Sequence, residues 1–368
     1  MAAVIDADTH LLESDEMWQH LDADMYARRP VKVRVPNDTL YGKSNVFWLI
    51  DGNIFPRPAG RGGMLLATPT DQESIAGRPD VKARELVDLE WRLKDMQAMG
   101  VDVQVVYPTL FLTYLTDDVR LEIALCKAYN RFLADVWARQ PRHIRWVLMP
   151  PLRSIEATID ELRYGKEHGA VGIFFRGIEK DRTLDDPYFF PVYEEASRLD
   201  LPICIHTGSG CPEFTKLIDV SRSSAFPHGR LLPLISIRNI ITNKIPEQFP
   251  KLRFACVETG ASWVPYILHN IRNKTEIATE QWGARLFDDY RIFIACEERE
   301  DIGYLVKYVG EDHLFTGTDY AHHATGAAFG GDPSAQPEMV RNLRAREDVA
   351  PGVIDKILSD NPRRLYGL

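Results

Sequence analysis

Eight short apolar runs recur along the chain, and each is followed by a polar or helix-like stretch. The runs are rich in Val, Ile and Phe without strict two-residue alternation, which is typical of strands covered on both faces. Repeated strand–helix units predict a parallel sheet, and eight units predict a closed (β/α)8 TIM barrel. An open doubly wound sheet is the alternative, but no GxGxxG motif follows the first run. The runs are Val4–His10, Val103–Thr109, Ile144–Pro150, Val171–Phe175, Ile203–His206, Phe254–Glu258, Ile292–Cys296 and Leu314–Asp319.

The connections between these runs are uneven in length. Residues 15–77 form a Pro- and Gly-rich segment that is too long for an ordinary strand–helix loop. We expect it to be an insertion over the active-site mouth of a single domain, 1–368. Long loops also follow the fifth and eighth runs, at Gly208–Pro233 and Ala321–Pro337. Helices are expected at Lys82–Met99, Asp118–Arg139, Ser154–His168, Pro187–Leu199 and Val264–Thr279.

Composition excludes several classes of protein. A formal net charge of −9 lacks the basic footprint of a general nucleic-acid binder. The chain has no apolar stretch of the roughly 18 residues that a membrane span needs, and its first residues do not read as a secretory signal. These features predict a cytoplasmic protein without membrane or nucleic-acid partners. The five cysteines are scattered and form no CxxC pair, which argues against disulfides or a Cys-ligated zinc.

Chemically active side chains stand at the carboxyl ends of several runs, which face the active site in a barrel. The first run supplies Asp8 and His10, the fifth His206, the sixth Glu258 and the eighth Asp319. A single His in such a position is more often structural, whereas two histidines and two carboxylates on strands 1, 5 and 8 make a set suited to Zn, Mn or Fe. We therefore predict a divalent metal held by Asp8, His10, His206 and Asp319.

With these motifs the chain resembles the amidohydrolase superfamily, in the amidohydrolase-2 branch that contains aminocarboxymuconate-semialdehyde and resorcylate decarboxylase-like enzymes. The resemblance covers nearly the whole chain and implies the same metal ligands. It departs from the family in the Asp-x-His pair of strand 1, in Arg176 at the end of strand 4 where some members carry a bridging Lys, and in Glu258, where decarboxylase-like members usually have a His. The motifs are Ile5–His10, Pro202–His206, Phe249–Phe254, Glu258–Pro265, Thr316–Tyr320 and Asn361–Leu368.

Three roles for Glu258 stay open: a general base, a ligand of a second metal, or a partner that orients a first ligand. Glu13 and His322 are further candidates for a second metal, although one ion is expected rather than two. For Glu13, a role as a helix-capping or loop carboxylate is slightly favoured. Arg57, Arg176 and His228 are candidates for holding an anionic substrate, with a plain surface charge as the alternative for Arg57.

Three functions remain open. The leading one is hydrolysis or non-oxidative decarboxylation of a small, carboxylated substrate, with Asp319 or Glu258 moving the proton. The second is a dinuclear Fe or Mn oxygenase component that needs an electron donor and works beside a sister subunit. The third is a non-catalytic structural subunit, against which the intact ligand set argues. We expect a homo-oligomer, or a hetero-oligomer with a related subunit if the protein is an oxygenase.

Overall fold

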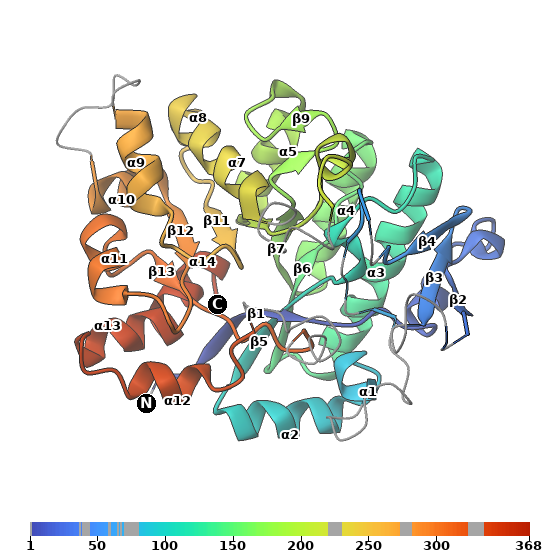
Figure 1. The fold of residues 1–368 in the computed structure, drawn as a ribbon, viewed down its shortest axis with the longest axis horizontal. Coiled ribbons are helices and arrows are strands. Elements are labelled where there is room, and N and C mark those ends of the chain that lie inside the picture. Colours follow the sequence, from blue (N-terminus) through green and yellow to red (C-terminus); the bar gives the residue numbers. More distant parts are fainter. Residues whose placement is uncertain are drawn as a thin grey trace.

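Eight parallel strands form the centre of the molecule, which confirms the predicted barrel (Figure 1). The computed structural model describes residues 2–36, 38, 45–57, 60–64, 66, 68–69, 81–219, 230–272, 282–322 and 335–368. All eight predicted runs contain a barrel strand, and the strands pair in the order in which they follow along the chain. They are β1 (Ile5–His10), β5 (Val103–Tyr107), β6 (Ile144–Leu148), β7 (Ala170–Phe175), β10 (Ile203–His206), β11 (Phe254–Val257), β12 (Ile292–Ala295) and β13 (Leu314–Phe315).

The segment after β13 closes the barrel against β1. The strand itself has only two residues, but the chain continues alongside β1. The amide of Ala7 donates to the carbonyl of Thr316 at 3.2 Å, and the amide of Asp319 donates to the carbonyl of Asp8 at 3.0 Å. The first barrel strand and the segment after the last one therefore pair as far as the carboxyl end of the barrel.

Helices surround the strands, and each of the five helical stretches predicted from the sequence contains at least one of them (Figure 1). One expected helix is broken: Lys82–Met99 divides into α1 and α2, because Leu86 has a left-handed backbone and Asp88 caps the second helix through the amides of Glu90 and Trp91. The predicted helix Val264–Thr279 is described as far as Arg272. Its remaining residues lie outside the described part of the chain. The sequence did not indicate α6, α7, α8, α10, α11 or the helices after residue 335.

The helices are α1 (Val81–Arg84), α2 (Leu89–Met99), α3 (Val119–Arg139), α4 (Ile155–Glu167), α5 (Phe190–Leu199), α6 (Pro212–Thr215), α7 (Leu231–Thr242), α8 (Ile245–Gln248), α9 (Val264–Arg272), α10 (Ala284–Tyr290), α11 (Ile302–Val309), α12 (Met339–Arg344), α13 (Pro351–Asp355) and α14 (Asn361–Tyr366). Short 3-10 turns are η1 (Met17–His20), η2 (Tyr26–Arg28), η4 (Leu110–Leu112) and η5 (Pro187–Phe189), and a π turn, η9, spans Lys356–Asp360. None of the described helices is long and apolar enough to cross a membrane.

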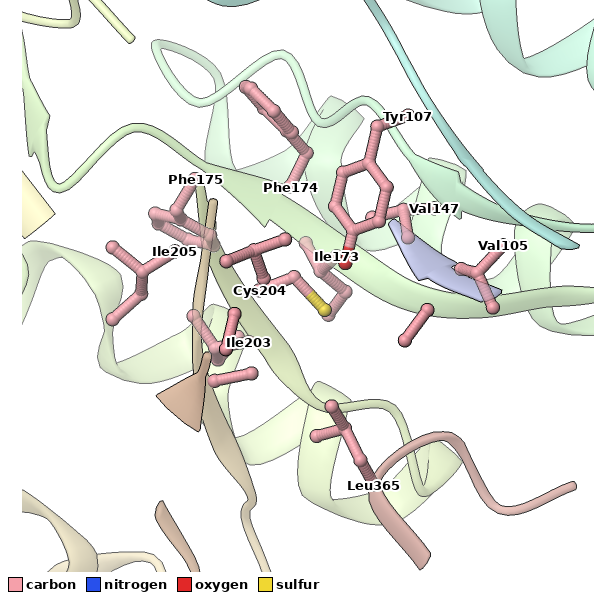
Figure 2. Close-up of a cluster of buried hydrophobic side chains, with 14 of the residues drawn as sticks. Val105, Tyr107, Val147, Ile173, Phe174, Phe175, Ile203, Cys204, Ile205 and Leu365 are labelled. Carbon is pink, nitrogen blue, oxygen red and sulfur yellow. The ribbon is translucent and has the colours of Figure 1, made fainter. Parts of the chain in front are cut away.

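Side chains from neighbouring barrel strands form a cluster of buried apolar residues (Figure 2). Tyr107, Phe174 and Cys204 are fully buried there, and Leu365 of α14 approaches the same cluster. The Tyr366 hydroxyl donates to the carbonyl of Ala7 at 2.8 Å and lies 2.7 Å from the Tyr107 hydroxyl. These contacts of Tyr366 attach α14 to β1 and β5.

The long segment after β1 contains a small antiparallel sheet of β2 (Val31–Arg34), β3 (Val46–Ile50) and β4 (Asn53–Phe55), beside the barrel (Figure 1). The amide of Gly62 donates to the carbonyl of Ile218 at 2.9 Å, which joins this segment to the connection that leaves β10. The assignment of residues 15–77 as an insertion over the active-site mouth stays a prediction, because several of them, including residues 70–77, lie outside the described part of the chain.

The closing segment leaves no room for a side chain at Gly317. A Cβ there would lie 2.4 Å from the Cβ of Asp8 and 2.5 Å from its amide nitrogen. We expect Gly317→Ala to lower the free energy of unfolding by about 2 kcal/mol or more, because the backbone of β1 must move. Gly352→Ala is the control: nothing lies within 4 Å of its added Cβ on helix α13, so it should leave the protein as stable or slightly more so. Chemical denaturation measures both, and equal stabilities would contradict the tight closure.

Candidate metal centre

The carboxyl ends of four barrel strands bring a group of metal-binding side chains together. Each contributes a nitrogen or oxygen, and within each of two overlapping groups these atoms lie within 4.8 Å of one another. Most of these side chains are almost completely buried. The first group is Asp8, His10, His206 and Glu258, and the second is His10, Glu258, Asp319 and His322.

Backbone carbonyls orient the two histidines that the barrel strands carry. Nδ1 of His10 lies 2.8 Å from the carbonyl of Pro108, and Nδ1 of His206 lies 2.9 Å from the carbonyl of Thr207. Because a carbonyl only accepts, each Nδ1 carries the proton and each Nε2 is turned toward the group. Among the described residues, Nε2 of His10 is buried without a hydrogen-bond partner. A metal ion is the natural acceptor of such a lone pair.

The spacing between donor atoms matches the first coordination shell of an ion. Nε2 of His206 lies 3.4 Å from Oδ1 of Asp8 and 3.2 Å from Oε2 of Glu258. Nε2 of His10 lies 3.6 Å from Oδ1 of Asp8 and 3.5 Å from Oδ1 of Asp319. Bonds of about 2.1 Å place neighbouring ligands about 3.0–3.4 Å apart. The residues present therefore fit a divalent ion.

The electrostatics of the group favour positive charge at its centre. Burial lowers the pKa of His10 well below its usual value, and the neighbouring His322 and His206 lower it further. For His206 burial acts in the same direction, but the carboxylates of Asp8 and Glu258 outweigh it and raise the pKa to about 9. Carboxylates that hold a proton this firmly on an imidazole attract a metal cation in its place.

The two carboxylates that follow β11 and β13 have an unusual backbone. Glu258 has φ 56° and Asp319 has φ 53°, in the left-handed region that few residues other than glycine adopt. Each such residue costs about 1 kcal/mol or more, and this strain is concentrated at functional sites. The backbone strain at both Glu258 and Asp319 therefore indicates that their side chains serve the function of the site.

Sequence reasoning missed the buried hydrogen-bond network behind the group. The guanidinium of Arg92, on α2, donates to the carbonyl of His10 and to the side chains of Thr9 and Gln104. Asp6 accepts from the amide and the hydroxyl of Thr318 at 2.7 and 2.6 Å. The signal available in the sequence was a polar residue inside each of two apolar strands, Asp6 in β1 and Gln104 in β5. Their role could be recognised only once β1 and the segment after β13 lay side by side.

Three other candidates from the sequence belong to neither group of donors, and a fourth lies outside the described residues. Glu13 accepts from the amides of Thr109 and Leu110, so it satisfies the first turn of η4 and belongs to neither group of donors. The guanidinium of Arg176 is buried against Glu179 and two carbonyls, because a buried cation needs such partners. Arg57 is exposed. His228 lies outside the described residues.

Comparison with known proteins gives the class of this chain. The family model described as Amidohydrolase matches residues 5–368. A 2-amino-3-carboxymuconate-6-semialdehyde decarboxylase from Dictyostelium discoideum is 23% identical over 248 residues, which are 63% of this chain and 66% of that protein, just under two thirds of its length.

Two solved structures share the fold over 100% of this chain. An amidohydrolase from Mycobacterium avium subsp. paratuberculosis K-10 gives a TM-score of 0.71 at 17% identity, with 98% of that chain covered. A 5-carboxyvanillate decarboxylase from Novosphingobium aromaticivorans, complexed with manganese and a nitrobenzoic acid, gives a TM-score of 0.69 at 16% identity, with 96% covered. The chain belongs to the amidohydrolase family, as the sequence motifs implied.

The buried Glu13 should make stability depend on pH. Burial raises its pKa to about 7 from an ordinary value of 4.5, so the folded state binds the proton more tightly than the unfolded state. This group therefore makes the protein less stable as the pH rises from about 5 to about 7, and the loss persists above pH 7. Replacement by the neutral Gln removes the effect. We expect Glu13→Gln to be on the order of 1–3 kcal/mol more stable than the natural protein at pH 8 and about equally stable at pH 5.

Thermal or urea unfolding at the two pH values measures this difference. The exposed Glu16 serves as the control position, and Glu16→Gln should show no such pH dependence. A Glu13→Gln variant that is less stable than the natural protein at pH 8 would mean that the carboxyl is ionised and well solvated in the fold.

Proposed function

We propose that this protein is a metal-dependent enzyme that removes CO2 from a small carboxylic acid without oxidation. One observation carries the proposal: the group of Asp8, His10, His206 and Glu258, whose atoms fit a divalent ion at the carboxyl end of the barrel, with Asp319 beside His10. The decarboxylase activities named for the similar proteins support the choice of reaction. A small-molecule substrate, a homo-oligomeric state and a cytoplasmic location belong to the same proposal.

Asp8, His10 and His206 would hold the ion together with Glu258, which belongs to their group, and Asp319, 3.5 Å from Nε2 of His10, is the further candidate ligand. The donors are imidazole nitrogens and carboxylate oxygens, which suit Mn, Zn or Fe. When bound, such an ion supplies Lewis acidity, which polarises a substrate oxygen and stabilises negative charge developing there. The manganese complex of the similar 5-carboxyvanillate decarboxylase supports this assignment.

The protein's own acids would handle the proton. In decarboxylation the bond between the substrate carbon and its carboxylate breaks, the electron pair stays on that carbon, a proton joins it, and CO2 leaves. Glu258 and Asp319 are the carboxyl groups nearest to the histidines, and the hydroxyl of Thr207 donates to Oε2 of Glu258 at 3.0 Å, which fixes its orientation. Either can deliver the proton in its acid form.

Hydrolysis is the second candidate, and Glu258 itself favours it. The carboxylate of Glu258, which follows β11, can accept a proton from an attacking water, in the role of a general base. The same residues then bind the substrate, and the reaction is decided by whether Glu258 gives or takes the proton. Product analysis separates the two: CO2 from decarboxylation, or an acid with an alcohol or amine from hydrolysis.

Replacement of Asp319 by Asn tests the site without disturbing the fold. Asn tolerates a left-handed backbone and keeps the shape of the side chain, but it cannot ionise, so it can neither carry the negative charge nor transfer a proton. We expect turnover to fall by roughly 10²–10⁴-fold while the melting temperature stays nearly the same. Asp200→Asn is the matched control, because Asp200 is also left-handed, with φ 55°, but lies at the end of α5. Full activity of Asp319→Asn would remove Asp319 from the mechanism.

Metal removal tests the reaction type. We expect protein stripped with a chelator to be inactive, and activity to return with added Mn²⁺, as CO2 release from carboxylated aromatic or muconic acids such as 5-carboxyvanillate. His206→Ala should not recover, because one of the ligands is missing. Metal-independent CO2 release, or ester and amide cleavage with no CO2, would overturn decarboxylation as the metal-dependent reaction.

A further inference from the structure

The side chain of Glu300 joins two loops at the carboxyl end of the barrel. It lies in the connection that leaves β12, and its Oε1 accepts from the amides of Ala261 and Ser262 at 2.9 and 2.7 Å, and from the hydroxyl of Ser262. Its Oε2 accepts from the amide of Glu297 at 2.9 Å. Because β11 and β12 are neighbouring parallel strands (Figure 1), one carboxylate binds the loops of both.

The loop that Glu300 binds is the one that carries Glu258. Glu258 follows β11 directly, and both Glu258 and Gly260 have a left-handed backbone, with φ 56° and 62°. The hydroxyl of Thr259 and the indole nitrogen of Trp263 both donate to the carbonyl of Gly260, at 3.0 and 2.7 Å. The loop is therefore a compact turn, so a contact at one end of it affects the other.

The strained backbone of Glu258 needs support on both sides, because such a conformation persists only where the surroundings enforce it. On the side of β11, pairing with β10 fixes the backbone as far as Val257. On the other side, the amides of Ala261 and Ser262 are bound to Glu300. Glu300 thus supplies contacts that hold the turn three residues after Glu258.

A simpler role for Glu300 is that of a helix cap. Ala261 and Ser262 lie just before α9, and an acidic side chain near the start of a helix is stabilising. Two observations go beyond a cap. The same carboxylate also binds the amide of Glu297 in its own loop, and a Cβ at Gly260 would lie only 3.2 Å from its Oε1. Glu300 therefore packs directly against the turn that begins at Glu258.

The position of Glu258 matters to the candidate metal centre. Its Oε2 lies 3.2 Å from Nε2 of His206 and accepts from the hydroxyl of Thr207 at 3.0 Å. Negative charge so close to this nitrogen favours a cation there, whether the carboxylate binds the ion itself or lies beside it. A turn that relaxed would move this charge away and weaken the binding of the ion.

We propose that Glu300 is a positioning residue, which binds the turn after β11 and thereby keeps the carboxylate of Glu258 beside Nε2 of His206. Glu300 belongs to neither group of donors, so it acts on the centre through Glu258. This inference rests on the proposed function, which assigns an ion to that centre. It adds a supporting side chain from the loop after β12, a strand that contributes no donor to either group.

Binding of Mn²⁺ tests the proposal without a substrate. The full-length protein is stripped of metal, and its dissociation constant for Mn²⁺ alone is measured by isothermal titration calorimetry. We expect Glu300→Ala to bind Mn²⁺ about tenfold more weakly, as is usual when a residue that orients metal ligands is lost. Asp301→Ala is the matched control. It loses a negative charge and the cap of α11 on the amide of Tyr304, but should bind Mn²⁺ as tightly as the natural protein.

A double-mutant cycle shows whether Glu300 acts through Glu258. Glu258→Gln keeps the shape of the side chain but removes its charge, and should itself weaken the binding of Mn²⁺. In that background we expect Glu300→Ala to weaken binding by less than about twofold more. A general loss of stability or of negative charge would act equally in both backgrounds. Glu300→Gln keeps one acceptor oxygen and should show a smaller effect, so it replaces Glu300→Ala in the cycle if that variant does not fold.

Two results would overturn the positioning role and leave the metal centre in place. One is natural affinity for Mn²⁺ in the Glu300 variants, or an equal weakening in both backgrounds. The other is natural affinity in Glu258→Gln, because the charge of Glu258 would then be irrelevant to the ion. Failure of the natural protein to bind Mn²⁺ would overturn the proposed function as well as this inference.

Discussion

The pairing of β1 with the segment after β13 is the contact on which the rest of the structure depends. The amide of Asp319 donates to the carbonyl of Asp8, and the amide of His10 donates to the carbonyl of Tyr320. These bonds close the barrel, and they also place metal-binding side chains from opposite ends of the chain at one point. The fold and the site are therefore built by the same interaction, and a defect in the closure is a defect in the site.

Closing the barrel removes charged groups from water. Hydrogen bonds and ion pairs with neighbouring groups offset the cost of that burial. Carbonyls of the loops fix Nδ1 of His10 and His206, and the buried guanidinium of Arg92 holds the backbone behind them. The carboxylates nearest to His206 then raise its pKa to about 9 against the effect of burial. The carboxylates around the two histidines give the site an excess of negative charge, and a bound cation stabilises such a site.

The sequence was sufficient for the barrel and for the candidate ligands at strand ends, because both depend on local periodicity and on one rule of parallel sheets. It was insufficient where the outcome depends on contacts between distant segments. Arg176 looked available for a substrate, but Glu179 occupies its guanidinium. For Glu13 the sequence left a metal ligand and a capping carboxylate open, and its contacts with the amides of the loop after β5 agree with the second. The break in the helix at Leu86 depends on a left-handed residue that no periodicity reveals.

The roles of two carboxylates, rather than the fold, decide the chemistry of this site. The fourth barrel strand, β7, is followed by Arg176, whose guanidinium is already paired with Glu179. Glu258 belongs to both groups of donors and Asp319 to the second, and each has a left-handed backbone. If both carboxylates held an ion, neither would be free to give or take a proton. A carboxylate can serve as ligand or as acid, and the division of these two roles between Glu258 and Asp319 separates decarboxylation from hydrolysis at this site.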